Sequence, residues 1–499
     1  MTSIEKRLLV FLWLGVSALL FFPVLFSLNQ SAIGSKELDL PAQLWNLWWQ
    51  NQPNSSQLVN FPIGVSEFYS LTPIHDFLSI LLAPNIIMAH NLVSLLGFSL
   101  CFFSGALLGL RYGNDRESPF LGALLLSLSV PMQAALLDGT GEFIWLGALV
   151  FFVLFLDKDH PSKGYFLVGS SALLALNLFL CWYYGAAALL FLVLWSLWNR
   201  KYWGLLSVVL GLGLSYTFIS NFMNSPFEPD KSSSSLLLHI LHGGNTPVVD
   251  AELAHLPIAQ KWQLSLRIPA LLSPWFWVLA LLCIRSLRGN IRRHRFYLLA
   301  IATSFLIALG SYTGSGLPLP MLWINRFLQY YGIEMHLPMH LSSLGIIALI
   351  IIALQDSFHP KMLLTALLLH LILIAPMESW TPDRSSFWTE IDRPIFHYEE
   401  IDSHDLAALN RVIELQLQHG QSIASFPIFP TNLVHHQGVD LVEKSQYNPS
   451  ELLGLGYGYV SIPKGRKDYP SWKENLDQCC LWKEHEDIWL YQLDLLFSP

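Results

Sequence analysis

The feature that most constrains this chain is a succession of apolar runs, each about 14 to 23 residues long, between residues 8 and 377. A helix needs roughly 20 apolar residues to cross a hydrocarbon layer about 30 Å thick. Hydrophobic residues make up 53% of the 499 residues and charged residues only 13%, whereas soluble proteins contain roughly 25% charged residues. The pattern predicts a mostly α-helical, polytopic membrane protein.

We expect a bundle of about eleven membrane spans. They lie near residues 8–27, 88–110, 118–135, 143–156, 165–180, 184–198, 204–222, 268–286, 297–312, 341–355 and 362–377. The apolar block 165–198 is too long for one helix, and we expect it to break at the segment 181–185.

The distribution of basic residues predicts the orientation of the bundle. With the N-terminus inside, the inner segments hold fourteen Lys and Arg residues, and the outer loops before residue 377 hold five. Lys and Arg are retained on the cytoplasmic side, so the N-terminus is expected to be cytoplasmic and the residues after 377 extracytoplasmic. The Arg-rich loop 285–295 is explained by topology, with contact to anionic lipid as the alternative.

Two domains are expected. Residues 1–377 form the transmembrane domain, with a first outer loop at 28–87, and residues 378–499 form a small soluble α/β domain. In the second domain, residues 405–418 have helical spacing of apolar side chains and residues 487–493 have the pattern of a strand.

Acidic, imidazole and guanidinium groups gather in the predicted outer loops. The candidate catalytic residues are Asp39 and Glu37, and the candidate substrate-binding residues are His75, Asp76, Asp138, Glu142, Arg267, Arg326, His336 and His340. A carboxylate at this depth can deprotonate an acceptor hydroxyl as a general base. An arginine can meet a phosphate with a two-pronged pair of donors.

Five of the candidates also have a purely structural interpretation. Asp39 and Asp76 each precede a predicted helix and are suited to cap it, and His75 is suited to the membrane interface. Asp138 and Glu142 flank two glycines in a tight turn, which turn chemistry alone explains. Both interpretations of these residues stay open.

The remaining motifs are weaker. Trp45, Trp48 and Trp49 share one helix face, which favours anchoring at the interface, with sugar stacking as the alternative. His336 and His340 would need a further ligand to hold a metal ion, so no metal site is predicted. A net charge of −8 argues against a nucleic-acid partner. Phosphate-loop, dinucleotide, zinc-protease and nucleophile-elbow motifs are missing from the sequence.

Several segments together resemble the membrane-embedded GT-C glycosyltransferases, and more closely a bacterial group of multispan proteins related to them. They are the acidic first loop with its tryptophans (37–49), Asn60-Phe61-Pro62-Ile63-Gly64, Leu71-Thr72-Pro73-Ile74-His75-Asp76, His90-Asn91-Leu92, the turn 138–142, and Pro318-Leu319-Pro320. The likeness covers roughly residues 1–377. It departs from the family where Leu38 splits the acidic doublet and where histidines replace arginines before the tenth span.

This resemblance implies a function. It implies a glycosyltransferase of a bacterial inner membrane that moves a sugar from a polyprenyl-phosphate donor to a glycan, lipid or protein acceptor on the outer face. Asp39 would be the base and Glu37 its substitute, and a divalent cation could assist. The alternatives are a transporter or flippase for a lipid-linked glycan and a non-catalytic partner in its assembly.

Overall fold

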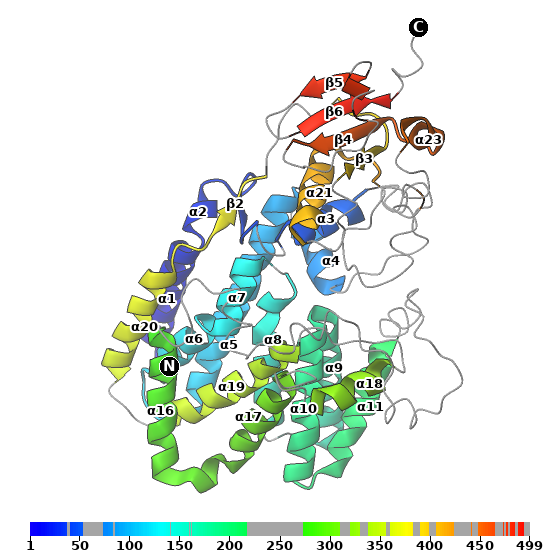
Figure 1. Ribbon diagram of the computed structural model, residues 1–499. Helices are drawn as coiled ribbons and strands as arrows, with labels where there is room; N and C mark the ends of the chain where they lie inside the picture. The colour runs from blue at the N-terminus through cyan, green and yellow to red at the C-terminus, as the bar shows by residue number, and fades with distance from the viewer. Residues whose placement is uncertain are drawn as a thin grey trace, which may run out of the picture. The chain divides into compact units, whose positions relative to one another are not determined.

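The computed structural model describes most of the chain (Figure 1). The described residues are 1–36, 40–52, 73–82, 85–139, 141–158, 160, 162–216, 273–309, 320–329, 338–355, 360–382, 390–398, 406–423, 441, 448–464, 473, 476–477, 480–484 and 488–493. They are mostly helical, as the sequence predicts.

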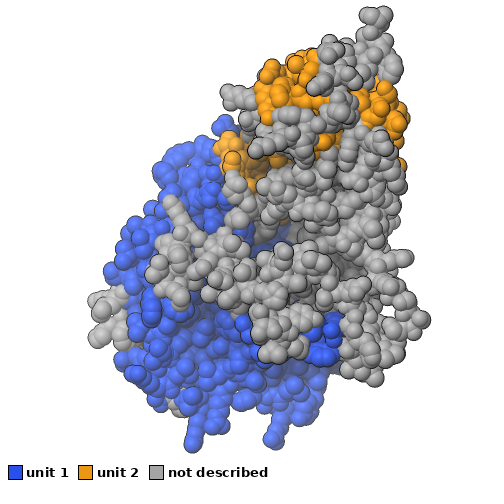
Figure 2. All heavy atoms as spheres, viewed as in Figure 1, with its two compact units in different colours: residues 1–35, 69–379 blue, residues 36–68, 380–499 orange. Residues whose placement is uncertain are grey.

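The chain forms two compact units, and each of them is built from two separate stretches of the sequence (Figure 2). Unit 1 comprises residues 1–35 and 69–379, and unit 2 comprises residues 36–68 and 380–499. The sequence-based boundary after residue 377 stays a prediction, but the compact units add one feature to it. The segment 36–68 of the first predicted outer loop belongs to the same unit as the C-terminal residues.

Unit 1 is a bundle of helices. Its helices are α1 (Ser3–Leu20), α2 (Phe22–Leu25), α4 (Pro73–Leu82), α5 (Ile86–Tyr112), α6 (Ser118–Ser127), α7 (Val130–Asp138), α8 (Leu146–Leu156), α9 (Lys163–Leu180), α10 (Trp182–Trp198), α11 (Leu205–Leu214), α16 (Pro274–Asn290), α17 (Arg295–Ala308), α18 (Pro320–Gln329), α19 (Ser342–Leu354) and α20 (Pro360–Ile374). Short 3-10 turns lie at η2 (Phe143–Trp145), η3 (Tyr202–Gly204), η5 (Ile291–His294) and η6 (Pro338–Leu341). One apolar core, with Phe98, Phe102, Phe152 and Ile350 among its buried side chains, runs through the bundle.

Each predicted apolar segment overlaps a helix or a helix pair among the described residues, but the count of about eleven spans is wrong by the length and composition of these helices. Within the described ranges, α5 and α9 are long and apolar enough to cross a membrane, and α6 with α7 makes a third if this pair, bent by 43°, is one span. The shorter apolar helices have 10–17 residues and rise only roughly 15–25 Å at 1.5 Å per residue. Ser129 and Pro131 mark the bend between α6 and α7.

Unit 2 contains a four-stranded sheet of order β3-β4-β6-β5. The strands are β3 (Ile395–His397), β4 (Tyr459–Pro463), β5 (Leu481–Glu484) and β6 (Ile488–Gln492). The β3–β4 pair is parallel, and the other two pairs are antiparallel. The predicted strand at 487–493 is confirmed as β6.

Two helices of unit 2 come from distant parts of the sequence and pack together. They are α3 (Leu40–Gln50) and α21 (Leu406–His419), and the short helix α23 (Pro449–Gly454) completes the unit (Figure 1). The predicted helix at 405–418 is confirmed as α21. The prediction that the tryptophans anchor the chain at a membrane interface is wrong for Trp45 and Trp49, because both are buried within unit 2. Their indoles stack with centroids 5.8 Å apart.

Candidate functional site

The turn between α7 and η2 brings two predicted site residues together. Helix α7 ends at Asp138, which is 9% exposed, and Gly139 caps it with a φ of 72°. This left-handed conformation suits glycine, so the sequence reverses direction here and places Glu142 directly before η2. The two carboxylates of the predicted turn therefore lie four positions apart at the end of a helix.

His75 of α4 lies against this turn. A Cβ atom on Gly141 would clash with the imidazole ring, so glycine is required for the ring to sit there. The ring is buried, and the indole of Trp145 meets it edge to face with centroids 6.3 Å apart. Burial lowers the pKa of His75 to about 4, so the ring is neutral at pH 7.

A second predicted histidine contacts η2. The ring of His340, in η6, stacks on Phe143 with centroids 3.6 Å apart and an interplanar angle of 12°. Tyr183 lies 5.3 Å from the His340 ring, and the Tyr184 hydroxyl donates to the Phe143 carbonyl oxygen at 2.7 Å. The structure therefore gathers four sequence-predicted residues, His75, Asp138, Glu142 and His340, around η2.

The segment that leads to the acidic residues 37–39 is fixed by the start of α5. Asn91 Oδ1 accepts a hydrogen bond from the backbone N–H of Ile33 at 2.9 Å, and its Nδ2 donates to the carbonyl oxygens of residues 28 and 31. His90 Nε2 lies 3.0 Å from the Ile33 carbonyl oxygen. His90 and Asn91 belong to the segments that carry the family resemblance, but their contacts with residues 28–33 were not predicted from the sequence.

Ser35 links the same segment to the carboxylate turn. Its backbone N–H donates to the carbonyl oxygen of Leu137 at 2.7 Å, one residue before Asp138. Its hydroxyl donates to Glu378 Oε1 at 2.9 Å. Both bonds join residues far apart in the chain, which local sequence patterns do not predict.

The other predicted site residues are not gathered with these four. Glu37, Asp39, Arg267 and His336 lie outside the described residues, and so does the side chain of Asp76. Arg326 lies on α18, and its guanidinium carbon is 5.1 Å from the centroid of the Trp323 ring.

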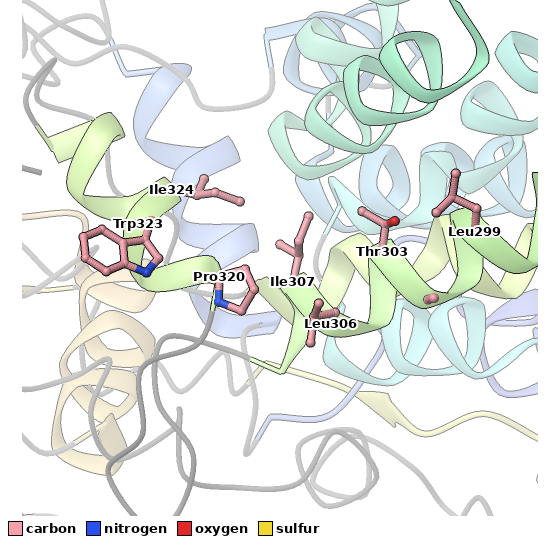
Figure 3. A pocket seen from close by; sticks show the side chains of 8 residues that line it. Leu299, Thr303, Leu306, Ile307, Pro320, Trp323 and Ile324 are labelled. Carbon is pink, nitrogen blue, oxygen red and sulfur yellow. The ribbon is translucent and has the colours of Figure 1, made fainter. Parts of the chain in front are cut away.

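An apolar pocket of about 660 Å³ lies between α17 and α18. Figure 3 shows the side chains that line it, among them Leu299, Thr303 and Ile307 of α17 and Trp323 and Ile324 of α18. The lining is almost entirely hydrocarbon, which suits an alkyl or isoprenyl chain.

Two buried polar groups were not predicted as candidate sites. In unit 1, Gln133 Nε2 donates to the Leu128 carbonyl oxygen at 2.6 Å and lies 2.9 Å from His370 Nε2, at the bend between α6 and α7. In unit 2, His397 and His419 meet at 3.0 Å between their Nε2 atoms. The position of His370 inside an apolar run was the one sequence signal that could have indicated its buried polar contact. The described residues contain no cluster of three metal-ligating side chains.

Comparison with known proteins gave no match to a protein-family model, to a curated protein or to a solved structure.

Proposed function

We propose that this protein is an integral membrane glycosyltransferase of the GT-C type. It transfers a sugar from a polyprenyl-phosphate donor to a hydroxyl group of a glycan, lipid or protein acceptor on the outer face of a bacterial inner membrane. The observation that supports this most is the gathering of His75, Asp138, Glu142 and His340 around one turn at the ends of apolar helices.

The membrane setting is supported by the surface of unit 1. Large apolar side chains are exposed on several helices, such as Phe11 (69%), Val168 (71%) and Ile372 (65%), whereas soluble monomers rarely expose large contiguous apolar patches. We infer that α5 and α9 cross the bilayer and that the shorter apolar helices complete a polytopic bundle. The orientation rests on the fourteen basic residues of the predicted inner segments against five outside.

An extracytoplasmic position of unit 2 agrees with its cysteine chemistry. Cys480 is disulfide-bonded, while Cys101, Cys181 and Cys283 of unit 1 are free thiols. Disulfides form in oxidising compartments such as the periplasm. The remaining cysteine, Cys479, lies outside the described residues.

In the proposed reaction, the Asp39 carboxylate takes the proton of the acceptor hydroxyl, with Glu37 as its substitute. The acceptor oxygen forms a bond to the anomeric carbon while the bond from that carbon to the phosphate oxygen breaks, which inverts the configuration. The polyprenyl phosphate leaves with the electron pair, and Arg326 or Arg267 stabilises its charge. His75, Asp76, Asp138, Glu142, His336 and His340 bind the sugar and acceptor hydroxyls. A divalent cation could assist, although a monophosphate needs it less than a diphosphate does.

A transporter or flippase for a lipid-linked glycan is the second candidate. The pocket between α17 and α18 favours it, because translocation needs a place for a hydrocarbon chain as much as transfer does (Figure 3). A non-catalytic assembly partner would need neither this pocket nor the gathered polar residues.

The test is sugar transfer by the purified full-length protein in vesicles that contain one of a panel of polyprenyl-phosphate sugars. Asp39→Asn is expected to lower kcat by at least about 100-fold, the lower range for loss of a general base. Asp115→Asn, on the predicted inner side, is the matched control and is expected to keep parental activity. Undiminished transfer by Asp39→Asn removes Asp39 from its role. Movement of the donor between leaflets without any transfer supports the transporter.

A further inference from the structure

The first residues of helix α17 contact the ends of two other helices of unit 1. Helix α17 follows α16 through the turn η5 (Figure 1). Phe296 of α17 meets the ring of Trp198, at the end of α10, with centroids 5.9 Å apart. Tyr297 meets Tyr112, the last residue of α5, edge to face with centroids 6.2 Å apart. Packing within unit 1 therefore brings together helix ends that are far apart in the sequence.

Exposed basic residues gather at this place. The turn after α10 contributes Arg200 and Lys201, and η5 with the first residue of α17 contributes Arg292, Arg293 and Arg295. All five are exposed, and we call them the basic surface. The described segments that contain them, 182–216 and 273–309, have no Asp or Glu in their sequence. The basic surface therefore has a net positive charge.

The carboxylate of Asp157, at the end of α8, lies toward the α5 side of the same contacts. Asp157 Oδ2 accepts a hydrogen bond from the Tyr112 hydroxyl at 2.8 Å and lies 3.7 Å from Arg111 Nε. Arg111 also donates to the Asp157 carbonyl oxygen at 2.7 Å. Because this carboxylate is already matched by an arginine of its own, it does not neutralise the basic surface.

The turn that contains three of the arginines is fixed to α16. His294 lies between Arg293 and Arg295, and its ring is buried. His294 Nε2 lies 3.2 Å from the hydroxyl oxygen of Ser286, in α16. A buried side chain with a polar contact holds the backbone of η5 in place, so the exposed guanidinium groups on either side extend from a fixed turn.

Exposed apolar and aromatic side chains adjoin the basic surface in sequence. They are Trp198 and Tyr202 around the turn after α10, and Ile284 and Ile291 around the end of α16. Trp and Tyr are favoured at the level of lipid headgroups. Cations and exposed hydrocarbon therefore occur together here, a combination that suits a ligand with an anionic head and apolar chains.

We propose that the basic surface binds the headgroup of an anionic phospholipid such as phosphatidylglycerol. Clusters of about 4–8 Lys and Arg residues beside membrane helices attract anionic lipid, and a guanidinium group can donate to two phosphate oxygens at once. The acyl chains would lie along the exposed apolar side chains, which free phosphate could not use. Topology alone places basic residues on the inner side, but it does not require that two distant turns form one surface without carboxylates. The inference goes beyond sugar transfer and rests on the membrane setting proposed above.

The experiment measures lipid binding to the purified full-length protein in a neutral detergent by native mass spectrometry. Phosphatidylglycerol is compared with phosphatidylcholine of the same acyl chains, which has no net charge, and with inorganic phosphate as a competitor. Arg292→Gln with Arg295→Gln removes two charges from the basic surface. Arg292→Lys with Arg295→Lys keeps both charges. Lys6→Gln with Arg7→Gln is the matched control, because it removes two exposed charges from α1, on the same predicted inner side.

The parent is expected to bind phosphatidylglycerol at least about 30-fold more tightly than phosphatidylcholine. The glutamine variant is expected to lose roughly 30-fold in affinity for phosphatidylglycerol, since each charge near a lipid surface changes binding about fivefold. The lysine variant and the control are expected to stay within about threefold of the parent. Thermal unfolding in the same detergent should be alike for all four proteins, which separates lost binding from lost folding.

Three results overturn the proposal. Equal affinity for the two lipids shows that the negative headgroup is not recognised. An equal loss in the control shows that the diffuse charge of the inner side attracts the lipid, and inorganic phosphate that displaces the lipid at similar concentration shows a site for the free anion. Failure of the membrane setting has a different signature, because the parent would then stay monodisperse without detergent before any lipid is added.

Discussion

Lowering the pH should loosen unit 2 because two neutral histidines meet in its core. Burial lowers the pKa of His419 to about 3, from an ordinary value of 6.5. Burial, and after it the charges of His419 and Arg411, holds the pKa of His397 well below its ordinary value. A proton on His419 would replace the acceptor Nδ1 by a donor that faces the backbone N–H of Gln421. The protonated ring therefore does not fit the folded unit.

The size and sign of the effect follow from the two pKa values. Below pH 6.5 the unfolded unit binds a proton at position 419 that the folded unit does not bind, so the free energy of unfolding falls as the pH falls. The stability is complete above pH 6.5 and is lost progressively between about pH 6.5 and pH 3. At pH 5 the loss from His419 alone is about 2 kcal/mol, which corresponds to a roughly 30-fold larger open population.

Hydrogen exchange of β4 measures this loss in the full-length protein. After correction for the intrinsic pH dependence of exchange, the protection of residues 459–463 is expected to fall at least about 30-fold between pH 7.5 and pH 5. His419→Gln has no titrating ring, so its protection is expected to fall by about 2 kcal/mol less over the same range. Parallel pH profiles for the parent and this variant would refute the reasoning, because they would show that His419 does not titrate in the unfolding step.

Three further predictions concern unit 1. Gly141→Ala places a methyl group where the His75 ring lies, so thermal unfolding should show a loss of about 1–3 kcal/mol and sugar transfer should fall with it; an unaltered melting curve contradicts the packing. Gln133→Leu leaves the Leu128 carbonyl at the α6–α7 bend without the amide that donates to it at 2.6 Å. The free energy of unfolding, measured with urea, should fall by about 1–3 kcal/mol, and a negligible change would contradict this contact. His340→Ala removes the ring that stacks on Phe143 at 3.6 Å and should lower the free energy of unfolding by about 0.5–1.5 kcal/mol, whereas His340→Phe should restore it. Equal melting temperatures of the two variants would contradict a stabilising stack.

The periodicity of apolar residues predicted the position and type of the helices and strands better than it predicted their lengths. The break expected at 181–185 lies at Cys181, whose extended backbone separates α9 from α10. The helix at 405–418 and the strand at 487–493 were found because one apolar face of each is buried. Composition does not indicate how an apolar run divides, so the bend at Ser129 and the short helices of unit 1 were not predicted.

The candidate site was predictable in part. Asp138 and Glu142 share one turn, and their proximity follows from sequence spacing alone. The approach of His75 and His340 to that turn depends on helix packing, which a local pattern does not contain. The tryptophans of α3 show the same limit, because their helical spacing is equally compatible with an interface and with a protein core. The burial of Trp45 and its contact with Gln416, 371 positions away, distinguish the two.

Unit 2 combines residues 36–68 with residues 380–499, and this separation in sequence has a consequence for synthesis. Helix α3 emerges from the ribosome some 350 residues before α21, its partner in unit 2. At roughly 5–20 residues per second, this separation leaves the indoles of Trp45 and Trp49 without their final neighbours for about 20–70 s. A chain that terminates before residue 406 would lack α21, and α3 would stay without its packing partner. We therefore expect nascent chains to need temporary protection of α3. Its exposed indoles would also mark incomplete chains for quality control.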